Sequence, residues 1–170
     1  MPTIAPAIDY FAAFSNPWAA TPGRAPVHLP AGEGETMAVL GQTVTVKVSA
    51  RQSGASATLF EIDCPSGTGT PPHREQGDET FYVLEGTMTF LVGDEVVHAG
   101  AGECLCVPRG TRHAEANTSG RPARALVLST LGARNERMFA DLAALGDAGR
   151  AAPHAVAEVC AAHGVSLAAD

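Results

Sequence analysis

One stretch of the chain, residues 67–86, combines metal-ligating side chains with the glycines and prolines of tight turns. It contains one imidazole, His73, and two carboxylates, Glu75 and Glu79. Residues two positions apart in an extended chain point to the same side, so His73 and Glu75 are expected to project from one face of a strand. Glu79 is expected to return to that face after a short turn.

A second stretch, residues 102–117, places His113 at the start of a later predicted strand. Antiparallel pairing inside a closed barrel can bring its imidazole close to His73 and Glu79. Two imidazoles and at least one carboxylate then converge, as a first-row divalent metal ion requires. A single histidine on a strand is usually a hydrogen-bonded residue of the core or surface, so the joint spacing is what predicts a metal site.

The elements that must position these residues are predicted to be β-strands. From about residue 37 to residue 131, short runs rich in Val, Thr, Phe and Leu alternate with Gly, Pro or Asp, which is typical of a β-sandwich or barrel. The dipeptide Gly93-Asp94 stands where a hairpin needs its tight turn. The strands are expected at residues 43–48, 58–62, 80–84, 87–92, 96–98, 104–107, 113–116 and 123–129.

The two ends of the chain differ from this central part. Residues 1–30 are rich in Ala and Pro and are predicted to form an arm. Residues 31–132 are predicted to form the barrel, and residues 133–170 a helical extension of the same domain. Two short helices in this extension are expected to pack on the outside of the barrel, the second one beginning at Pro153 and ending near Gly164.

Composition narrows the class of protein. The 170 residues are 45% hydrophobic and 17% charged, which suits one globular domain. The net charge of -7, without any basic cluster, disfavours nucleic acid as a partner. No apolar run approaches the roughly 20 residues that span a bilayer, and the first residues do not have the pattern of a secretory signal. The four cysteines are predicted to be reduced thiols, which suits the cytoplasm. We therefore expect a cytoplasmic protein that binds neither nucleic acid nor membrane.

The two stretches resemble the paired motifs of the cupin superfamily, G-x5-H-x-H-x(3,4)-E-x6-G and G-x5-P-x-G-x2-H-x3-N. The matching residues are Gly67, His73, Glu79 and Gly86 in the first motif and Gly102, Pro108, Gly110, His113 and Asn117 in the second. The chain is also similar to single-domain bacterial cupins related to quercetin 2,3-dioxygenase. This resemblance implies an all-β fold, the double-stranded β-helix or jelly-roll barrel, holding one divalent metal ion.

The first motif departs from the family pattern at one ligand position, where Glu75 replaces a histidine. If Glu75 coordinates, the ligands are His73, Glu75, Glu79 and His113, a set that favours Fe, Mn or Ni over Zn or Cu. If Glu75 turns away, the other three form a face like the two-histidine, one-carboxylate triad of non-haem iron oxygenases. A site that has lost its metal is the third alternative.

Glu115 is a second unusual feature, because it shares the inward face of His113. A carboxylate inside a barrel is costly unless it is paired. We expect it either to lie near the metal, with a raised pKa and a role as a base, or to pair with Arg112 or another arginine at the barrel mouth.

The resemblance implies a metal-dependent enzyme, in the first place a dioxygenase or related oxidoreductase. Its substrate is expected to be a small aromatic, phenolic or enolic compound that chelates the metal through its oxygens. Glu75 and Glu115 are the predicted catalytic residues. The alternatives are a cupin isomerase or decarboxylase and a non-catalytic protein that binds a small molecule. A homodimer is expected from similar cupins.

Overall fold

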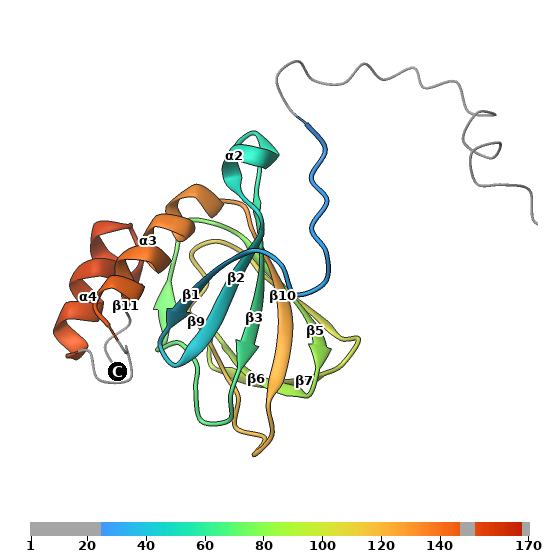
Figure 1. Cartoon of the computed structure of the whole chain (residues 1–170). Coiled ribbons are helices and arrows are strands. Elements are labelled where there is room, and N and C mark those ends of the chain that lie inside the picture. The colour runs from blue at the N-terminus through green and yellow to red at the C-terminus, as the bar shows by residue number, and fades with distance from the viewer. Residues whose placement is uncertain (1–24, 147–151, 168–170) are drawn as a thin grey trace, which may run out of the picture.

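Two antiparallel β-sheets face each other in the computed structural model, which describes residues 25–146 and 152–167 (Figure 1). The strands are β1 Glu35–Val39, β2 Gln42–Val48, β3 Thr58–Cys64, β4 His73–Arg74, β5 Glu79–Glu85, β6 Thr87–Val92, β7 Glu95–Gly100, β8 Cys104–Val107, β9 His113–Ala116, β10 Ala123–Ser129 and β11 Ser166–Leu167. The helices are α2 Ala50–Ser53, α3 Gly132–Ala144 and α4 Pro153–Ala162. All eight strands predicted from the sequence are present, and the predicted jelly-roll class is confirmed.

The strand order shows how distant stretches of the chain become neighbours. One sheet has six strands in the order β1-β2-β3-β10-β5-β8, and the other has five in the order β11-β4-β9-β6-β7. The first motif supplies β4 to the five-stranded sheet and β5 to the six-stranded sheet. Residues of one short stretch therefore face each other across the interior.

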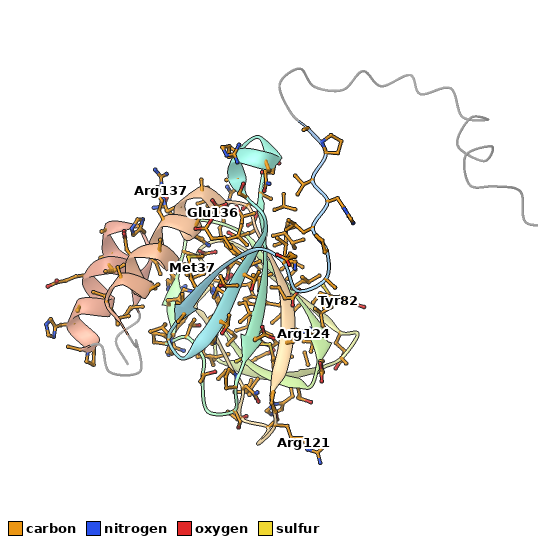
Figure 2. All side chains as sticks on the ribbon, viewed as in Figure 1. Met37, Tyr82, Arg121, Arg124, Glu136 and Arg137 are labelled. Carbon is orange, nitrogen blue, oxygen red and sulfur yellow. The ribbon has the colours of Figure 1, made fainter. Side chains whose placement is uncertain are left out.

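The interior between the sheets is filled by alternate residues of each strand. In β5, Glu79, Phe81 and Val83 are buried while Tyr82 is exposed, and Figure 2 shows Tyr82 pointing away from the barrel. Phe81 meets Phe90 of the opposite sheet with ring centroids 5.1 Å apart. Such aromatic contacts bury large apolar areas and hold the two sheets together.

Turns and loops follow the sequence signals closely. Gly93 and Asp94 form the two-residue connection of the β6–β7 hairpin, since Val92 pairs with Glu95 and Gly93 has a left-handed φ of 62°. The motif residue Asn117 is fully buried, and its Nδ2 donates to the carbonyl oxygens of Cys64 and Arg121 at 2.7 and 2.6 Å. Asn117 therefore joins the end of β3 to the β9–β10 connection and has a structural role.

The C-terminal helices flank the barrel on one side, as expected (Figure 1). Helix α4 begins at Pro153, and Gly164, with φ of 73°, ends it. Phe139 of α3 packs edge-on against Phe60 of β3 with ring centroids 5.1 Å apart. Glu136 of α3, labelled in Figure 2, accepts a hydrogen bond from the Thr58 hydroxyl at 2.6 Å. Strand β11 then pairs with β4, so the end of the extension adds to the five-stranded sheet.

Most of the N-terminal arm predicted for residues 1–30 lies outside the described residues. Residues 25–30 are exposed and form neither helix nor strand. The domain boundaries at residues 30 and 132 therefore stay predictions. Within the described ranges, every helix is too short or too polar to cross a lipid bilayer.

Candidate metal centre

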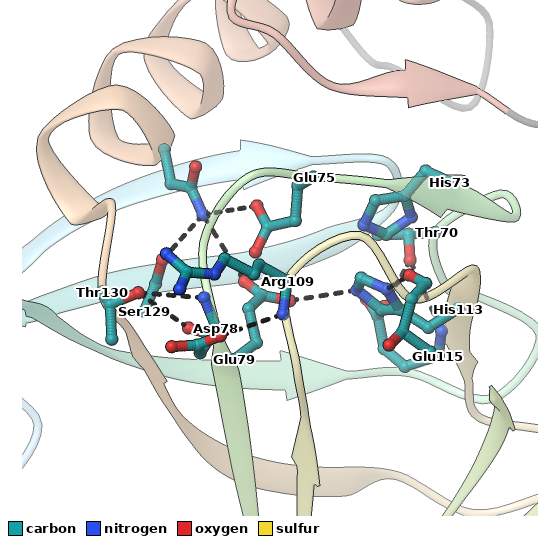
Figure 3. A network of polar contacts seen from close by, with 12 residues as sticks. Thr70, His73, Glu75, Asp78, Glu79, Arg109, His113, Glu115, Ser129 and Thr130 are labelled. Carbon is teal, nitrogen blue, oxygen red and sulfur yellow. Dashed lines mark hydrogen bonds and ion pairs between the residues drawn. The ribbon is translucent and has the colours of Figure 1, made fainter.

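The two predicted histidine ligands lie opposite each other on neighbouring strands. His73 of β4 is the direct partner of His113 of β9 in the antiparallel ladder, and their ring centroids are 4.2 Å apart. Glu79 approaches from β5 in the facing sheet, where its Oε2 lies 3.3 Å from Nε2 of His113 (Figure 3). One ligand atom from each of the three residues lies within 4.8 Å of the others. We refer to His73, Glu79 and His113 as the triad.

Backbone hydrogen bonds orient both imidazoles in the same way. Nδ1 of His73 lies 2.9 Å from the carbonyl oxygen of Pro71, and Nδ1 of His113 lies 3.0 Å from that of Thr111. A carbonyl only accepts, so each Nδ1 carries the hydrogen and each Nε2 keeps its lone pair in the neutral ring. Hydrogen bonding at one nitrogen is the usual way in which proteins orient a metal-ligating histidine.

The electrostatics of the two rings differ because their neighbours differ. Burial lowers the pKa of His73, and the nearby imidazole of His113 lowers it further. Burial also acts to lower the pKa of His113, but its hydrogen bonds to Glu79 and to the Thr111 carbonyl outweigh this and raise the pKa overall. The neutral form of His73, which a metal needs, is thus already favoured.

The donor atoms of the triad suit a divalent cation. When both rings are neutral, the lone pair of His113 Nε2 faces a carboxylate oxygen of Glu79, and two acceptors cannot bond to each other. A cation among the three residues resolves this conflict, since all three groups can donate electron pairs to it. Two imidazoles and one carboxylate on one side of an ion also leave its other coordination positions open.

Glu75 lies next to the triad without being part of it. Strand β4 ends at Arg74, and the backbone carbonyl of Glu75 then accepts a hydrogen bond from the Gly110 amide at 2.8 Å. The side chain is buried, and its Oε2 accepts a hydrogen bond from Nδ2 of Asn135 at 3.2 Å. Its other oxygen, Oε1, is buried without a hydrogen-bond partner.

The pKa of Glu75 reflects this environment. Burial and the negative charge of Glu79 raise the pKa of Glu75 to about 8. The hydrogen bond from Asn135 acts in the opposite direction and lowers this pKa. The cluster of possible ligand atoms contains His73, Glu79 and His113 without Glu75, and coordination of an ion by Glu75 stays a prediction.

Glu115 faces the interior, as the strand alternation predicted. It is 4% exposed and accepts hydrogen bonds from the Thr70 hydroxyl and, at 3.5 Å, from Nε2 of Gln42. None of the ion pairs among the described residues involves Glu115. The expected pairing with Arg112 is wrong, because Nη1 of Arg112 donates to the carbonyl oxygen of Gly93 instead.

Burial also explains the pKa of Glu115. Loss of hydration and the charge of Glu79 raise this pKa to about 7, although the hydrogen bond from Thr70 acts to lower it. An acid whose pKa rises from 4.5 on folding binds its proton more tightly in the folded state. The free energy of unfolding therefore falls as pH rises from 4.5 to about 7.

The free energy of unfolding of the metal-free Glu115→Gln variant should not fall in this way with rising pH, because an amide does not ionise. We expect the variant to be more stable than the wild type at about pH 8, by on the order of 1–3 kcal/mol, and to lose this advantage below about pH 5. Urea unfolding of chelator-treated protein at both pH values measures the difference. A stability difference that stays constant with pH would contradict this account of Glu115.

Two members of the triad, His73 and Glu79, border a cavity between the sheets and the C-terminal helices. Its free space is about 610 Å³, including the part that opens to solvent. Barrel residues such as Phe81 and Val127 and helix residues such as Met138 and Leu142 make most of its wall apolar. Glu75 and Glu115 border it too, and none of the described residues that line it is a lysine or arginine.

Helix α3 contributes to this site, which was not predicted from the sequence. The helix was expected to have only a structural role on the outside of the barrel, yet Met138, Phe139 and Leu142 line the cavity. Asn135 lines it as well and is 2% exposed. One signal was available, because Asn135 is a polar residue three positions before Met138 on the apolar face of the helix.

The two facing antiparallel sheets, with the triad between them, have the jelly-roll architecture that the sequence motifs predicted. In agreement with this, residues 60–129 match a family model described as the cupin domain. No curated protein matches the chain.

Solved structures with a similar fold include the polyketide cyclase RemF from Streptomyces resistomycificus. It is 22% identical, the match covers 62% of this chain and 79% of that one, and the TM-score is 0.56. A predicted oxalate decarboxylase from Thermotoga maritima is 22% identical over 53% of this chain and 80% of that one, with a TM-score of 0.51. A cupin-like protein from the same organism is 15% identical over 53% and 68%, with a TM-score of 0.50. At these identities, the similarity shows the shared fold.

Proposed function

We propose that this protein is a metal-dependent cupin enzyme, a dioxygenase or related oxidoreductase, that acts on a small phenolic or enolic substrate. The observation that carries the proposal is that the triad forms a ligand cluster beside an apolar cavity, which His73 and Glu79 line and whose described lining has no lysine or arginine. A metal ion bound there would act as a Lewis acid that polarises oxygen atoms of the substrate. A face of two histidines and one carboxylate with open coordination positions is the set that non-haem Fe(II) oxygenases use.

In this proposal His73, Glu79 and His113 bind the ion through one side of its coordination sphere. The single carboxylate neutralises half of the charge of a divalent cation, so the site keeps a net positive charge. That charge favours an ionised oxygen on the substrate.

The lining of the cavity supports a particular substrate chemistry. Glu75, Glu79 and Glu115 all border it, so the second negative charge of a small dianion such as oxalate would meet carboxylates and no lysine or arginine beside the metal ion. Phe60, Ile62 and Phe81 offer an apolar surface to the body of a ring or an alkyl chain. A neutral molecule with one acidic hydroxyl suits both features.

We assign proton transfer from the substrate hydroxyl to Glu75, with Glu115 as the second candidate. Glu75 lines the cavity, and its Oε1 is buried with no hydrogen-bond partner, so this oxygen can accept a proton from a bound phenol or enol. Glu115 already accepts a hydrogen bond from Thr70.

Oxygen consumption tests the proposal. Chelator-treated protein is reloaded separately with Fe(II), Mn(II), Ni(II) and Co(II) and is then supplied with simple phenols, catechols and 1,3-diketones in an oxygen electrode. We expect metal-dependent uptake with at least one enolic or phenolic substrate, and no reaction with oxalate. The metal-free protein, treated identically, is the control.

Other outcomes would overturn the assignment as a dioxygenase. Conversion of a substrate without oxygen uptake would indicate a cupin isomerase or decarboxylase. Tight binding without conversion under every metal would indicate a small-molecule-binding protein.

A further inference from the structure

Asn135 is a buried amide that reaches the candidate metal centre from outside the barrel. It belongs to α3, is 2% exposed and otherwise shares its face of the helix with apolar residues. Its Nδ2 lies 2.9 Å from the hydroxyl oxygen of Ser129, 3.2 Å from Oε2 of Glu75 and 3.5 Å from Oε1 of Glu79.

The geometry shows which of these contacts matter most. An amide nitrogen carries two hydrogens, so it cannot donate equally to three acceptors. The two shorter contacts are to Ser129 and Glu75, while the distance to Glu79 is at the outer limit of a hydrogen bond. Asn135 therefore restrains Glu75 more strongly than Glu79.

Glu75 has a reason to move if this restraint is removed. It lines the same cavity as His73 and Glu79, and its Oε1 has no partner in the protein. A cation bound by His73, Glu79 and His113 would attract this second carboxylate across a region with little water to screen the charge. The hydrogen bond from Asn135 opposes that movement.

We propose that Asn135 is a positioning residue that keeps Glu75 outside the ligand set of the metal. The ion is then bound by three protein side chains instead of four. One more coordination position stays open for substrate, and Glu75 stays available for proton transfer. Helix α3 thus determines the number of ligands even though it lies outside the barrel.

This inference rests on the proposed metal site, and a double-mutant cycle tests it separately. The variants are Glu75→Gln, Asn135→Leu and the combination of the two. The dissociation constant for Co(II) is measured by chelator competition, and the visible absorption of the Co(II) form reports its ligand set. Ser129→Ala is the matched control, because it removes another acceptor of the same amide and leaves both carboxylates in place.

We expect the effect of Glu75→Gln on Co(II) binding to depend on the residue at position 135. In the wild-type background, Glu75→Gln should change the dissociation constant for Co(II) by less than about threefold. In the Asn135→Leu background, the same substitution should raise the dissociation constant about tenfold or more. The absorption spectrum of Asn135→Leu should differ from that of the wild type, and the added Glu75→Gln substitution should reverse the difference. Ser129→Ala should keep the wild-type spectrum.

Three results separate the possible failures. If the wild type does not bind Co(II), the proposed metal site itself is wrong. If the wild type binds but Glu75→Gln has the same effect in both backgrounds, the role of Asn135 is wrong. A large effect of Glu75→Gln in the wild type would mean that Glu75 is already a ligand, which also overturns the inference. If Asn135→Leu does not fold, Asn135→Ala removes the same hydrogen bonds with a smaller side chain and replaces it in the cycle.

Discussion

Replacing Glu79 by glutamine is expected to weaken Co(II) binding by at least about 100-fold, because the variant loses a direct ligand and not only a supporting residue. Glu79 is the one member of the triad that comes from the six-stranded sheet, and it is the one that carries negative charge. Glutamine keeps the shape of the side chain and removes the charge. His73 and His113 alone would then bind the cation from one side.

Chelator competition measures the dissociation constant of the variant, and circular dichroism checks that it is folded. Glu61→Gln is the matched control, since Glu61 lies on β3 of the same sheet and pairs with Lys47 and Arg124 away from the triad. The control should bind Co(II) within about twofold of the wild type, because the partly exposed charge of Glu61 is balanced by Lys47 and Arg124. Binding by Glu79→Gln as tight as that of the wild type would exclude Glu79 as a ligand.

Replacing Gly132 by alanine is expected to be the most destabilising single-methyl change at the contact of helix and barrel. A Cβ at this position would lie 1.8 Å from the Oγ1 of Thr58 and 2.6 Å from its backbone nitrogen. The Thr58 side chain cannot simply rotate away, because it is fully buried and donates to Glu136. Either β3 or the first turn of α3 must shift.

Overpacking of this kind costs about 3 kcal/mol, at the upper end of the usual range, because a backbone atom is among the clashing atoms. A loss of that size lowers the melting temperature by roughly 6–12 °C for a chain of this length. Urea and thermal unfolding measure both quantities. Gly100→Ala is the control, since its Cβ would meet only a flexible carboxylate oxygen of Glu103 at 3.4 Å. Equal stability of the two variants would contradict the tight packing of the start of α3 on β3.

The sequence determined the strands and the turns because these depend on local physics. Side-chain alternation with a period of two requires only neighbouring residues, and it predicted that Glu115 faces inward. Tight turns depend on a few residues, as at Gly93-Asp94. The motif spacing also predicted that His73, Glu79 and His113 form one group, which the structure brings together. The homodimer, the cytoplasmic location and the identity of the metal stay predictions.

Only the tertiary structure decided how the remaining residues surround that group. Strand alternation could not tell whether the carboxylate of Glu75 joins it, because β4 ends at Arg74 and the hydrogen bond to Asn135 spans 60 positions of the chain. Strand alternation also could not identify the partner of Glu115. This partner is Thr70, which lies 45 positions away, and not the expected arginine. Such contacts depend on where a helix and a strand meet after folding, and no local pattern of residues encodes that meeting point.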